Sequence, residues 1–353
     1  MSAATRHGLV RPSLRVPPPP QTKGQLMPCF HRHARLKTPL AAALAALPAF
    51  LPAQAAPYPE HAVTIVVPFS AGGSTDAIAR AVAQRLGEAL GKPVVVENKA
   101  GAAGAIGSAH VARAKPDGHT LLVGSDTTIS IRPQLSPPAP YDPARQFVPV
   151  GMLATAPIVF VAAPNTPASS VRELVDFSKQ QQKPLSYADS GVGTPHYLIG
   201  ELFKQATGID ITHIGYKGGG EKMNDVLAGH VQFTATELGA AAPYFDKGQL
   251  KPIGIATAKR HRKWPDLPTL AEQGVTSFDA SSWFGIFAPA GTPAAVVDKL
   301  NAELRAVLSS DRLQESFDRM GFEASTLSQR QFADFLVRDR AKWAKAIKAS
   351  GTE

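Results

Sequence analysis

The segment VTIVVPFSAGGSTDAIAR, residues 63–80, decides the fold of this 353-residue chain. Residues 63–67 form an apolar run that predicts a buried strand. Residues 74–90 then repeat apolar side chains every four positions, which indicates one face of a helix: Ile78, Val82, Leu86 and Leu90. Ser74 or Thr75 is expected to cap the start of this helix, and Gly91 is expected to end it. Between the strand and the helix lie residues 71–73, Ala-Gly-Gly, where the backbone can come close to a ligand. The segment therefore predicts an α/β unit with a binding loop at its turn.

The same alternation continues to the end of the chain. Further strands are predicted at residues 94–96, 121–123, 185–188, 211–214, 231–234, 252–257 and 284–288, and a long apolar stretch covers residues 150–161. Helices are predicted at residues 106–114, near 128, at 171–179, 195–206 and 221–227, within 289–308, and around 332–347. We expect two similar α/β series with a largely parallel sheet, and we expect the last helices to return to the first series.

The first 55 residues have the features of an export signal. Residues 1–26 are rich in Pro and Arg, so the start of translation is expected at Met27. Basic residues then precede an apolar stretch at residues 38–52, and Ala-Gln-Ala at 53–55 is a signal-peptidase pattern. The stretch is too short for a membrane span. We expect a mature chain of residues 56–353 in the periplasm.

The charge and the cysteine content disfavour two classes of function, which are nucleic-acid binding and thiol or disulfide chemistry. The chain has 37 Lys and Arg against 28 Asp and Glu, and seven of the basic residues lie in residues 1–55. The mature chain then carries 30 basic and 28 acidic residues, a net charge of +2, which disfavours nucleic acid as a partner. The single cysteine, Cys29, lies in the expected signal, so we expect neither disulfide nor thiol chemistry in the mature protein.

Three polar loops follow predicted strands, where ligands of open α/β sheets bind. The first spans residues 70–75, the second 124–128 and the third 189–196. The first and third open helices, whose free N–H groups suit an anion. One such loop often serves only a tight turn. Two of the same kind, one in each series, favour a cleft with loops facing one another.

Enzyme and cofactor motifs are not met in the sequence. The segment GAAGAIG at residues 101–107 fails the G-x-G-x-x-G spacing, and YKGGGEK at 216–222 fails the P-loop spacing. The histidines lack metal-ligand spacing, and no hydrolase motif occurs. The basic run at residues 259–264, KRHRKW, is typical of a solvated turn. A dinucleotide-dependent enzyme stays only a weak alternative; we expect no cofactor and no metal.

Eight stretches in one order resemble the substrate-binding receptors of tripartite tricarboxylate transporters, the Bug family. The resemblance covers about residues 58–350 and rests on VPFSAGGSTDAIAR, VVVENKAGAAGAIGS, KPDGHTLLVG, YDPARQFVPVGMLATAP, SYADSGVGTPHYLIGELFKQATG, YKGGG, DLPTLAEQGV and WFGIFAPAGTP. It implies a type II periplasmic-binding-protein fold, in which two α/β lobes are joined by two crossing strands with a ligand cleft between them. The crossings are expected near residues 155–158 and 282–284. Lobe 1 is expected at 56–157 plus 283–353, and lobe 2 at 158–282.

The resemblance also implies a function and a set of ligand-binding residues. Receptors of this kind hold a small organic carboxylate, often through backbone N–H groups and water, and deliver it to membrane subunits. We expect a monomer with no chemistry of its own; a sensor without a transporter is the alternative. The candidate ligand-binding residues are Phe69, Ser70, Ala71, Gly72, Gly73, Asp76, Ser125, Asp126, Thr127, Thr128, Asp189, Ser190, Gly191, Gly193, Thr194, His196, Tyr216, Thr236 and Glu237.

The chain departs from the family pattern at three positions. Thr236 stands where an acid that can hold a ligand ammonium is common, with Glu237 next to it. Asp189 replaces a small hydroxyl residue in the third loop, and Asp126 adds an acid to the second. Acids beside an anion site are unexpected. They either point away or hold a hydroxyl or cation of the ligand. We expect a carboxylate without an essential amine.

Overall fold

The structure is a computed structural model that describes residues 58–216, 219–275 and 280–352, and residues 56–353 form one compact unit. The expected signal, its cleavage site and Cys29 lie outside the described residues. Within the described ranges, no helix combines the length and the apolar character needed to cross a membrane.

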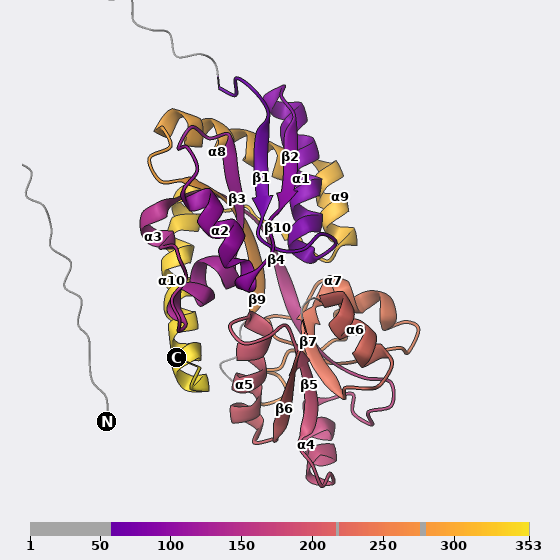
Figure 1. Cartoon of the computed structure of the whole chain (residues 1–353). Coiled ribbons are helices and arrows are strands. Elements are labelled where there is room, and N and C mark those ends of the chain that lie inside the picture. Colours follow the sequence, from indigo (N-terminus) through magenta and orange to yellow (C-terminus); the bar gives the residue numbers. More distant parts are fainter. Residues whose placement is uncertain (1–57, 217–218, 276–279, 353) are drawn as a thin grey trace, which may run out of the picture. The chain divides into compact units, whose positions relative to one another are not determined.

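Strands and helices alternate as the sequence predicts (Figure 1). The strands are β1 Val63–Val67, β2 Val94–Asn98, β3 Thr120–Ser125, β4 Phe147–Ala162, β5 Leu185–Asp189, β6 Ile211–Gly215, β7 Phe233–Glu237, β8 Lys251–Ile255, β9 Ser281–Pro289 and β10 Glu323–Ala324. The α-helices are α1 Ser74–Leu90, α2 Ala105–Ala112, α3 Pro143–Gln146, α4 Val171–Lys179, α5 Pro195–Thr207, α6 Gly219–Leu227, α7 Leu238–Ala241, α8 Ala294–Leu308, α9 Asp311–Arg319 and α10 Gln329–Ser350. Short turns are η1 Ala102–Gly104, η2 Asp126–Ile131, η3 Arg132–Gln134 and η4 Ala242–Tyr244.

The strands form a mixed sheet in the order β2-β1-β3-β9-β4-β7-β5-β6. Strands β2, β1 and β3 are parallel, and so are β6, β5 and β7. The two parallel sets are separated by the long strands β4 and β9, which pair antiparallel to each other. The expected largely parallel series are therefore present, joined through an antiparallel centre.

Strand β4 connects the two halves because it changes its partner along its length. Up to Pro157 it pairs with β9, and from Ile158 it pairs with β7. Its side chains are mostly buried, as expected for a strand covered on both faces. The polypeptide thus passes from one α/β half to the other through β4 and returns through β9, which confirms the predicted pair of crossing strands.

Apolar packing ties the C-terminal helix to both halves. Phe332 and Leu336, in the first part of α10, pack in a cluster with Trp283 of β9. Trp343 and Ile347, in its second part, pack in a cluster with α5. Side-chain spacing every three or four residues lets one long helix present both sets. The sequence predicted that the whole C-terminal segment belongs to the first half, but helix α10 contacts both halves.

Two local predictions need correction. Helix α1 was expected to start at a Ser74 or Thr75 cap, but its N-cap is Gly73, with no side-chain cap. Its predicted end at Gly91 is confirmed, with that glycine in the left-handed region. The uncertain helix near residue 128 is a single π-helical segment, η2. Such segments are rare and often occur at functional sites.

Candidate functional site

The carboxyl ends of β3 and β7 face one another across the centre of the sheet. Strand β4 runs parallel to β3, since both are antiparallel to β9, while β7 is antiparallel to β4. Phe284 of β9 pairs with Ser125 at the end of β3 and with Ala154 of β4, so these two residues lie at the same level of the sheet. Glu237, at the end of β7, pairs with Ile158 of β4. Four residues of strand separate these levels by about 13 Å. The loops predicted to bind a ligand therefore approach one another from opposite directions.

The first loop is held by Asp76, a predicted ligand residue whose carboxylate is already occupied. Its Oδ2 accepts the N–H of Gly72 at 3.0 Å and the guanidinium of Arg80 at 2.9 Å, and its Oδ1 accepts Asn98 Nδ2 at 3.0 Å. Burial alone would raise the pKa of Asp76, but these hydrogen bonds lower it to about 2. Asp76 is therefore a positioning residue for the loop.

The start of α1 keeps its polar backbone free for an anion. The helix begins after Gly73, and in the described part of the chain no side chain caps it. The first N–H groups of a helix have no partner inside it. Ser70, Ala71 and Gly72 in the same loop are exposed. The loop thus offers backbone donors at the positive end of a helix.

A chain of three ionisable side chains shapes the third loop. Asp189 is 1% exposed; its Oδ1 accepts the N–H of Gly191 at 2.6 Å, and its Oδ2 lies 2.6 Å from His213 Nδ1. On the other side, His213 Nε2 lies 2.6 Å from Glu201 Oε1. The carboxylate of Asp189 is therefore engaged with its own loop and with His213.

The helix after the third loop has a side-chain cap, in contrast to α1. Thr194 accepts the N–H of Tyr197 at 3.4 Å and donates its hydroxyl to the carbonyl of Gly191 at 2.8 Å. Gly191 and Gly193 adopt positive φ angles of 94° and 87°, which the turn requires. Ser190 stays partly exposed at the loop. The hydroxyl of Thr194 was predicted to bind ligand, but its hydrogen bonds are local.

The second loop is buried and largely self-bonded. Thr128 Oγ1 accepts the N–H of Ser125 at 3.0 Å, and the carbonyl of Thr128 accepts the hydroxyl of Tyr141 at 2.7 Å. Asp126 Oδ1 accepts the N–H of Thr127 at 2.7 Å. Asp126 Oδ2 is buried without a hydrogen-bond partner among the described residues. Asp126 is thus a predicted residue of this loop with one carboxylate oxygen that receives no hydrogen bond from the described residues.

A buried charge cluster lies at the end of β7. Glu237 Oε1 is 3.6 Å from His196 Nε2, and Lys222, 1% exposed, donates to the carbonyl of Ala235 at 2.8 Å. Burial lowers the pKa of Lys222 to about 8 and that of His196 to about 4. Burial would raise the pKa of Glu237, but His196 and Lys222 hold it below its usual range. The cluster thus holds Glu237 as a carboxylate next to Lys222, which keeps most of its charge at neutral pH.

The prediction missed Lys222 as part of the site. The residue belongs to the segment at 216–222, which was tested only against the phosphate-loop pattern. Its helical position places it on the inner face of α6, but nothing local to the sequence shows that a lysine there is buried. Asn98 and Arg80, which hold the first loop, were also missed. The contact of Asn98 with Asp76 joins residues 22 apart in sequence, whereas the spacing of four residues between Asp76 and Arg80 on one helix was a local signal.

The remaining predicted residues lie around these loops. Thr236 is buried and pairs with Val159 across the sheet. The backbone N–H of Tyr216 donates to the backbone carbonyl of Asp189 at 2.9 Å, while the hydroxyl of Tyr216 donates to the carboxylate of Asp225 at 2.6 Å. Phe69 packs beside Gly104, where an added Cβ would lie 3.2 Å from its ring. The side chains of Tyr216 and Phe69 therefore serve packing or local bonding in this structure.

The glycines at residues 101–107 allow close packing. A Cβ on Gly104 would lie 2.5 Å from Thr128, and one on Gly107 would lie 2.7 Å from the carbonyl of Lys99. These contacts bring the segment against the first and second loops. Backbone approach is sufficient to explain the glycines at these two positions.

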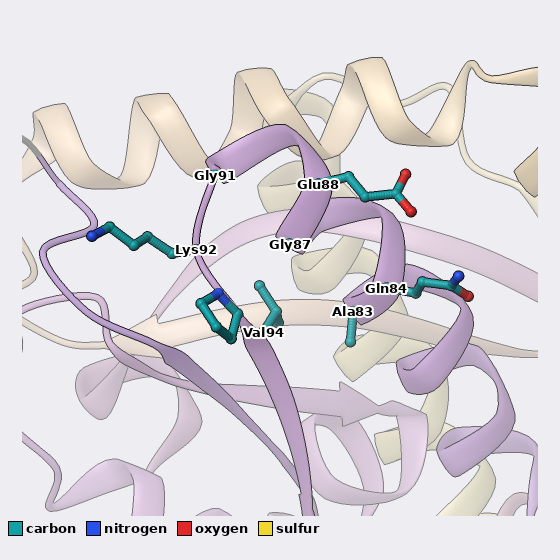
Figure 2. A pocket seen from close by; sticks show the side chains of 8 residues that line it. Ala83, Gln84, Gly87, Glu88, Gly91, Lys92 and Val94 are labelled. Atoms are coloured by element: carbon teal, nitrogen blue, oxygen red, sulfur yellow. The ribbon is translucent and has the colours of Figure 1, made fainter.

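Two surface recesses lie outside the centre of the sheet. The one in Figure 2 has a volume of about 420 Å³ and lies between the last turns of α1 and the amino end of β2, away from the carboxyl ends (Figure 2). A second, of about 310 Å³, touches the third loop at Val192 and is lined also by Ala102, Ala103, Arg132, Leu135, Ser136 and Thr352. Among the described residues, no group of three or more His, Cys, Asp or Glu is placed to hold a metal ion.

The basic run at residues 259–264 is paired with acids. Arg260 contacts Glu272 at 2.9 Å, and Arg262 and Lys263 contact Asp318 of α9 at 3.0 and 3.1 Å. These ion pairs are partly exposed, so each contributes little to stability. The run thus lies at the surface, as predicted. Its ion pairs with Asp318 also join the segment before β9 to helix α9, which follows β9 in the chain.

Comparisons with known proteins agree on one family. A family profile described as "Tripartite tricarboxylate transporter family receptor" matches residues 78–352. The adipate-bound structure of Rpa4515 from R. palustris is 35% identical, with a TM-score of 0.79 over 83% of this chain and 98% of that one. The periplasmic binding protein BugD is 35% identical, with a TM-score of 0.77 over 84% and 99%. Malate-bound MatC from Rhodopseudomonas palustris is 30% identical, with a TM-score of 0.76 over 82% and 100%.

Proposed function

The chain belongs to the tripartite tricarboxylate transporter receptor family, and we propose that it captures a small organic carboxylate in the periplasm and delivers it to membrane transport subunits. The fold is that of periplasmic binding proteins of this family, as predicted. The relatives Rpa4515 and MatC bind adipate and malate, both small dicarboxylates. The observation that carries the proposal is the family match at residues 78–352, which spans both α/β halves and most of the loops at their facing ends.

The first loop supports a carboxylate as the ligand. Uncapped N–H groups at the start of α1 favour negative charge. We propose that the ligand carboxylate lies between residues 70–73 and the third loop, with its charge offset by these groups.

The same geometry supports a ligand without an essential amine. Asp189 is engaged by His213 and its own loop, and Glu237 is offset by Lys222. Thr236 carries no charge. An ammonium enclosed beside these three residues would find no free carboxylate partner among them, and an unpaired buried charge is costly.

A ligand screen tests this function. We expect adipate, malate or succinate to raise the melting temperature of ligand-free refolded protein. At a hundredfold excess over Kd, the bound ligand should add about 2.7 kcal/mol to the free energy of unfolding. Succinate should bind more tightly than aspartate in calorimetry. Clearly tighter binding of aspartate would overturn the ligand class, and no binding of any carboxylate would overturn the receptor function.

Export and delivery need separate experiments. We propose that the mature chain is a monomer that begins near Ala56, with lobe 1 at residues 56–157 plus 283–353 and lobe 2 at 158–282. Mass spectrometry of the periplasmic protein should show that residues 1–55 are absent. Deleting the gene should abolish uptake of the labelled carboxylate identified in the screen; normal uptake would instead favour a sensor without transport.

A further inference from the structure

A buried carboxyl group with one unpaired oxygen lies in the second loop, which packs against α10. Asp126 is 2% exposed, and only its Oδ1 accepts hydrogen bonds, from the N–H of Thr127 at 2.7 Å and from the Thr127 hydroxyl at 3.4 Å. Its Oδ2 has no partner among the described residues. This side chain follows directly on the carboxyl end of β3, the end that faces β7.

The charges around Asp126 are mostly negative. The charged groups whose fields act on it are Asp339 and Lys342 of α10, which packs on the second loop, and Glu237 at the end of β7. The side chain of Lys342 is 44% exposed, so water weakens its field. Two acids and one partly solvated cation do not compensate a buried carboxylate, whose ionisation without a partner costs several kcal/mol.

Asp339 has more polar neighbours than Asp126. Its Oδ2 accepts the indole N–H of Trp283 at 2.8 Å, and its Oδ1, which has no hydrogen-bond partner among the described residues, lies 3.5 Å from the cationic Lys342 Nζ. Asp126 has donors from Thr127 alone and no cation in contact among the described residues. Its pKa is raised to about 8, first by burial and then by the charge of Asp339.

We propose that Asp126 keeps its carboxyl proton at neutral pH and donates it in a hydrogen bond to the anionic ligand, which makes Asp126 a specificity-determining residue. This inference rests on the proposed function for the identity of the ligand. A protonated carboxyl is a donor that suits a carboxylate and gives an ammonium no counter-charge. An approaching anion disfavours ionisation of Asp126 further, so binding and retention of the proton support each other.

Infrared spectroscopy of the ligand-free protein tests the proton directly. At pH 7 the wild type should show the carbonyl stretch of a protonated carboxylic acid, which disappears in Asp126→Asn and titrates near pH 8. The matched control Asp298→Asn removes an exposed carboxylate on α8 and should keep the band. Absence of the band, or its persistence in Asp126→Asn, overturns the proposal whatever the ligand is.

Calorimetry tests the coupling to ligand, with adipate and malate as probes. Between pH 6.5 and 9.5 the wild-type and Asp298→Asn affinities should fall by at least about tenfold, because one bound proton gives a tenfold change per pH unit above the pKa. The affinity of Asp126→Asn should vary little over this range. An equal fall in that variant overturns the inference. If neither probe binds at any pH, the proposed function fails for these ligands, and the infrared result decides the inference.

Discussion

At the scale of single residues, the side chains around the candidate site divide into those that shape loops and those that remain available. Asp76 and Asp189 have their oxygens satisfied by backbone N–H groups and by neighbouring side chains. Loop backbones without such partners, above all before α1, remain free for a ligand. Asp76 and Asp189 therefore order the first and third loops of the candidate site.

Replacing Gly73 should abolish ligand binding without unfolding the protein. Its φ of −84° suits any residue, and an added Cβ would meet only the carbonyl of Ser70, at 3.9 Å. The positive φ of this loop, 86°, belongs to Gly72. In Gly73→Val we expect a loss of stability below about 1 kcal/mol, the cost of a poor N-cap, and no heat of binding with adipate or malate. Wild-type affinity would contradict the placement of the ligand.

Gly72→Ala is the contrasting variant. A side chain there has space but must adopt a left-handed conformation, which costs roughly 1–2 kcal/mol. Chemical unfolding should therefore separate the two glycines, with Gly72→Ala the less stable protein.

Replacing His213 should destabilise the fold in a pH-dependent way. Burial would lower the pKa of His213, but hydrogen bonds and charges from Asp189 and Glu201 raise it. The stabilisation is therefore complete below the unfolded value of about 6.5 and is lost as pH rises through the folded pKa. We expect His213→Gln to cost about 2 kcal/mol at pH 6, the scale of hydrogen bonds to charged groups, and clearly less at pH 9.

Urea unfolding at both pH values measures this difference. His230→Gln is the matched control, because His230 is an exposed surface histidine with a weak contact to Asp225 at 3.4 Å. A cost for His213→Gln that does not change with pH would show that the imidazole acts only through packing.

At the scale of elements, the close approach of α7 to the end of α9 fixes the region after β7. A Cβ added to Gly239 would lie 1.9 Å from the carbonyl oxygen of Met320 and 2.9 Å from Gly321 Cα. Helix α7 follows directly on Glu237, so this contact positions the end of β7 at the site. Only glycine permits this approach.

Gly239→Ala should therefore lower the free energy of unfolding by more than about 2 kcal/mol, since backbone must move to make room. Gly220→Ala in α6 is the control, because a Cβ there meets no atom within 4 Å. Alanine favours a helix over glycine, so the control should be as stable as the wild type or slightly more so. Equal stabilities of the two variants would contradict the tight contact.

At the scale of the whole molecule, two crossing strands and one long helix connect the halves. Helix α10 packs against β9 and α5, and Arg262 and Lys263 pair with Asp318. The chain itself crosses between the halves through the two neighbouring strands β4 and β9, an arrangement that suits closure by a hinge.

Small-angle scattering should show a smaller radius of gyration with saturating adipate or malate than without. The variant Gly73→Val supplies the control and should show no contraction under the same conditions. An unchanged radius in the wild type, with binding confirmed by calorimetry, would contradict hinge closure.

The sequence by itself determined the elements and the loops at their ends. Apolar periods of two and of 3.6 are local properties, so β1, α1 and α5 could be located from a few residues each, and Gly91 marked the end of α1. The polar loops followed because ligands bind beyond the carboxyl ends of such strands.

The tertiary structure alone decided what each loop side chain contacts. Asp126 and Asp339 are 213 residues apart in sequence, and Lys222 is buried only because α6 packs on the end of β7. Hydrogen-bond partners and burial depend on long-range packing, which no local pattern encodes. For that reason the sequence could predict an anion site but not the contacts of its acids. Asp76 and Asp189 are satisfied by their own loops together with Asn98 and His213, while one oxygen of Asp126 has no partner among the described residues.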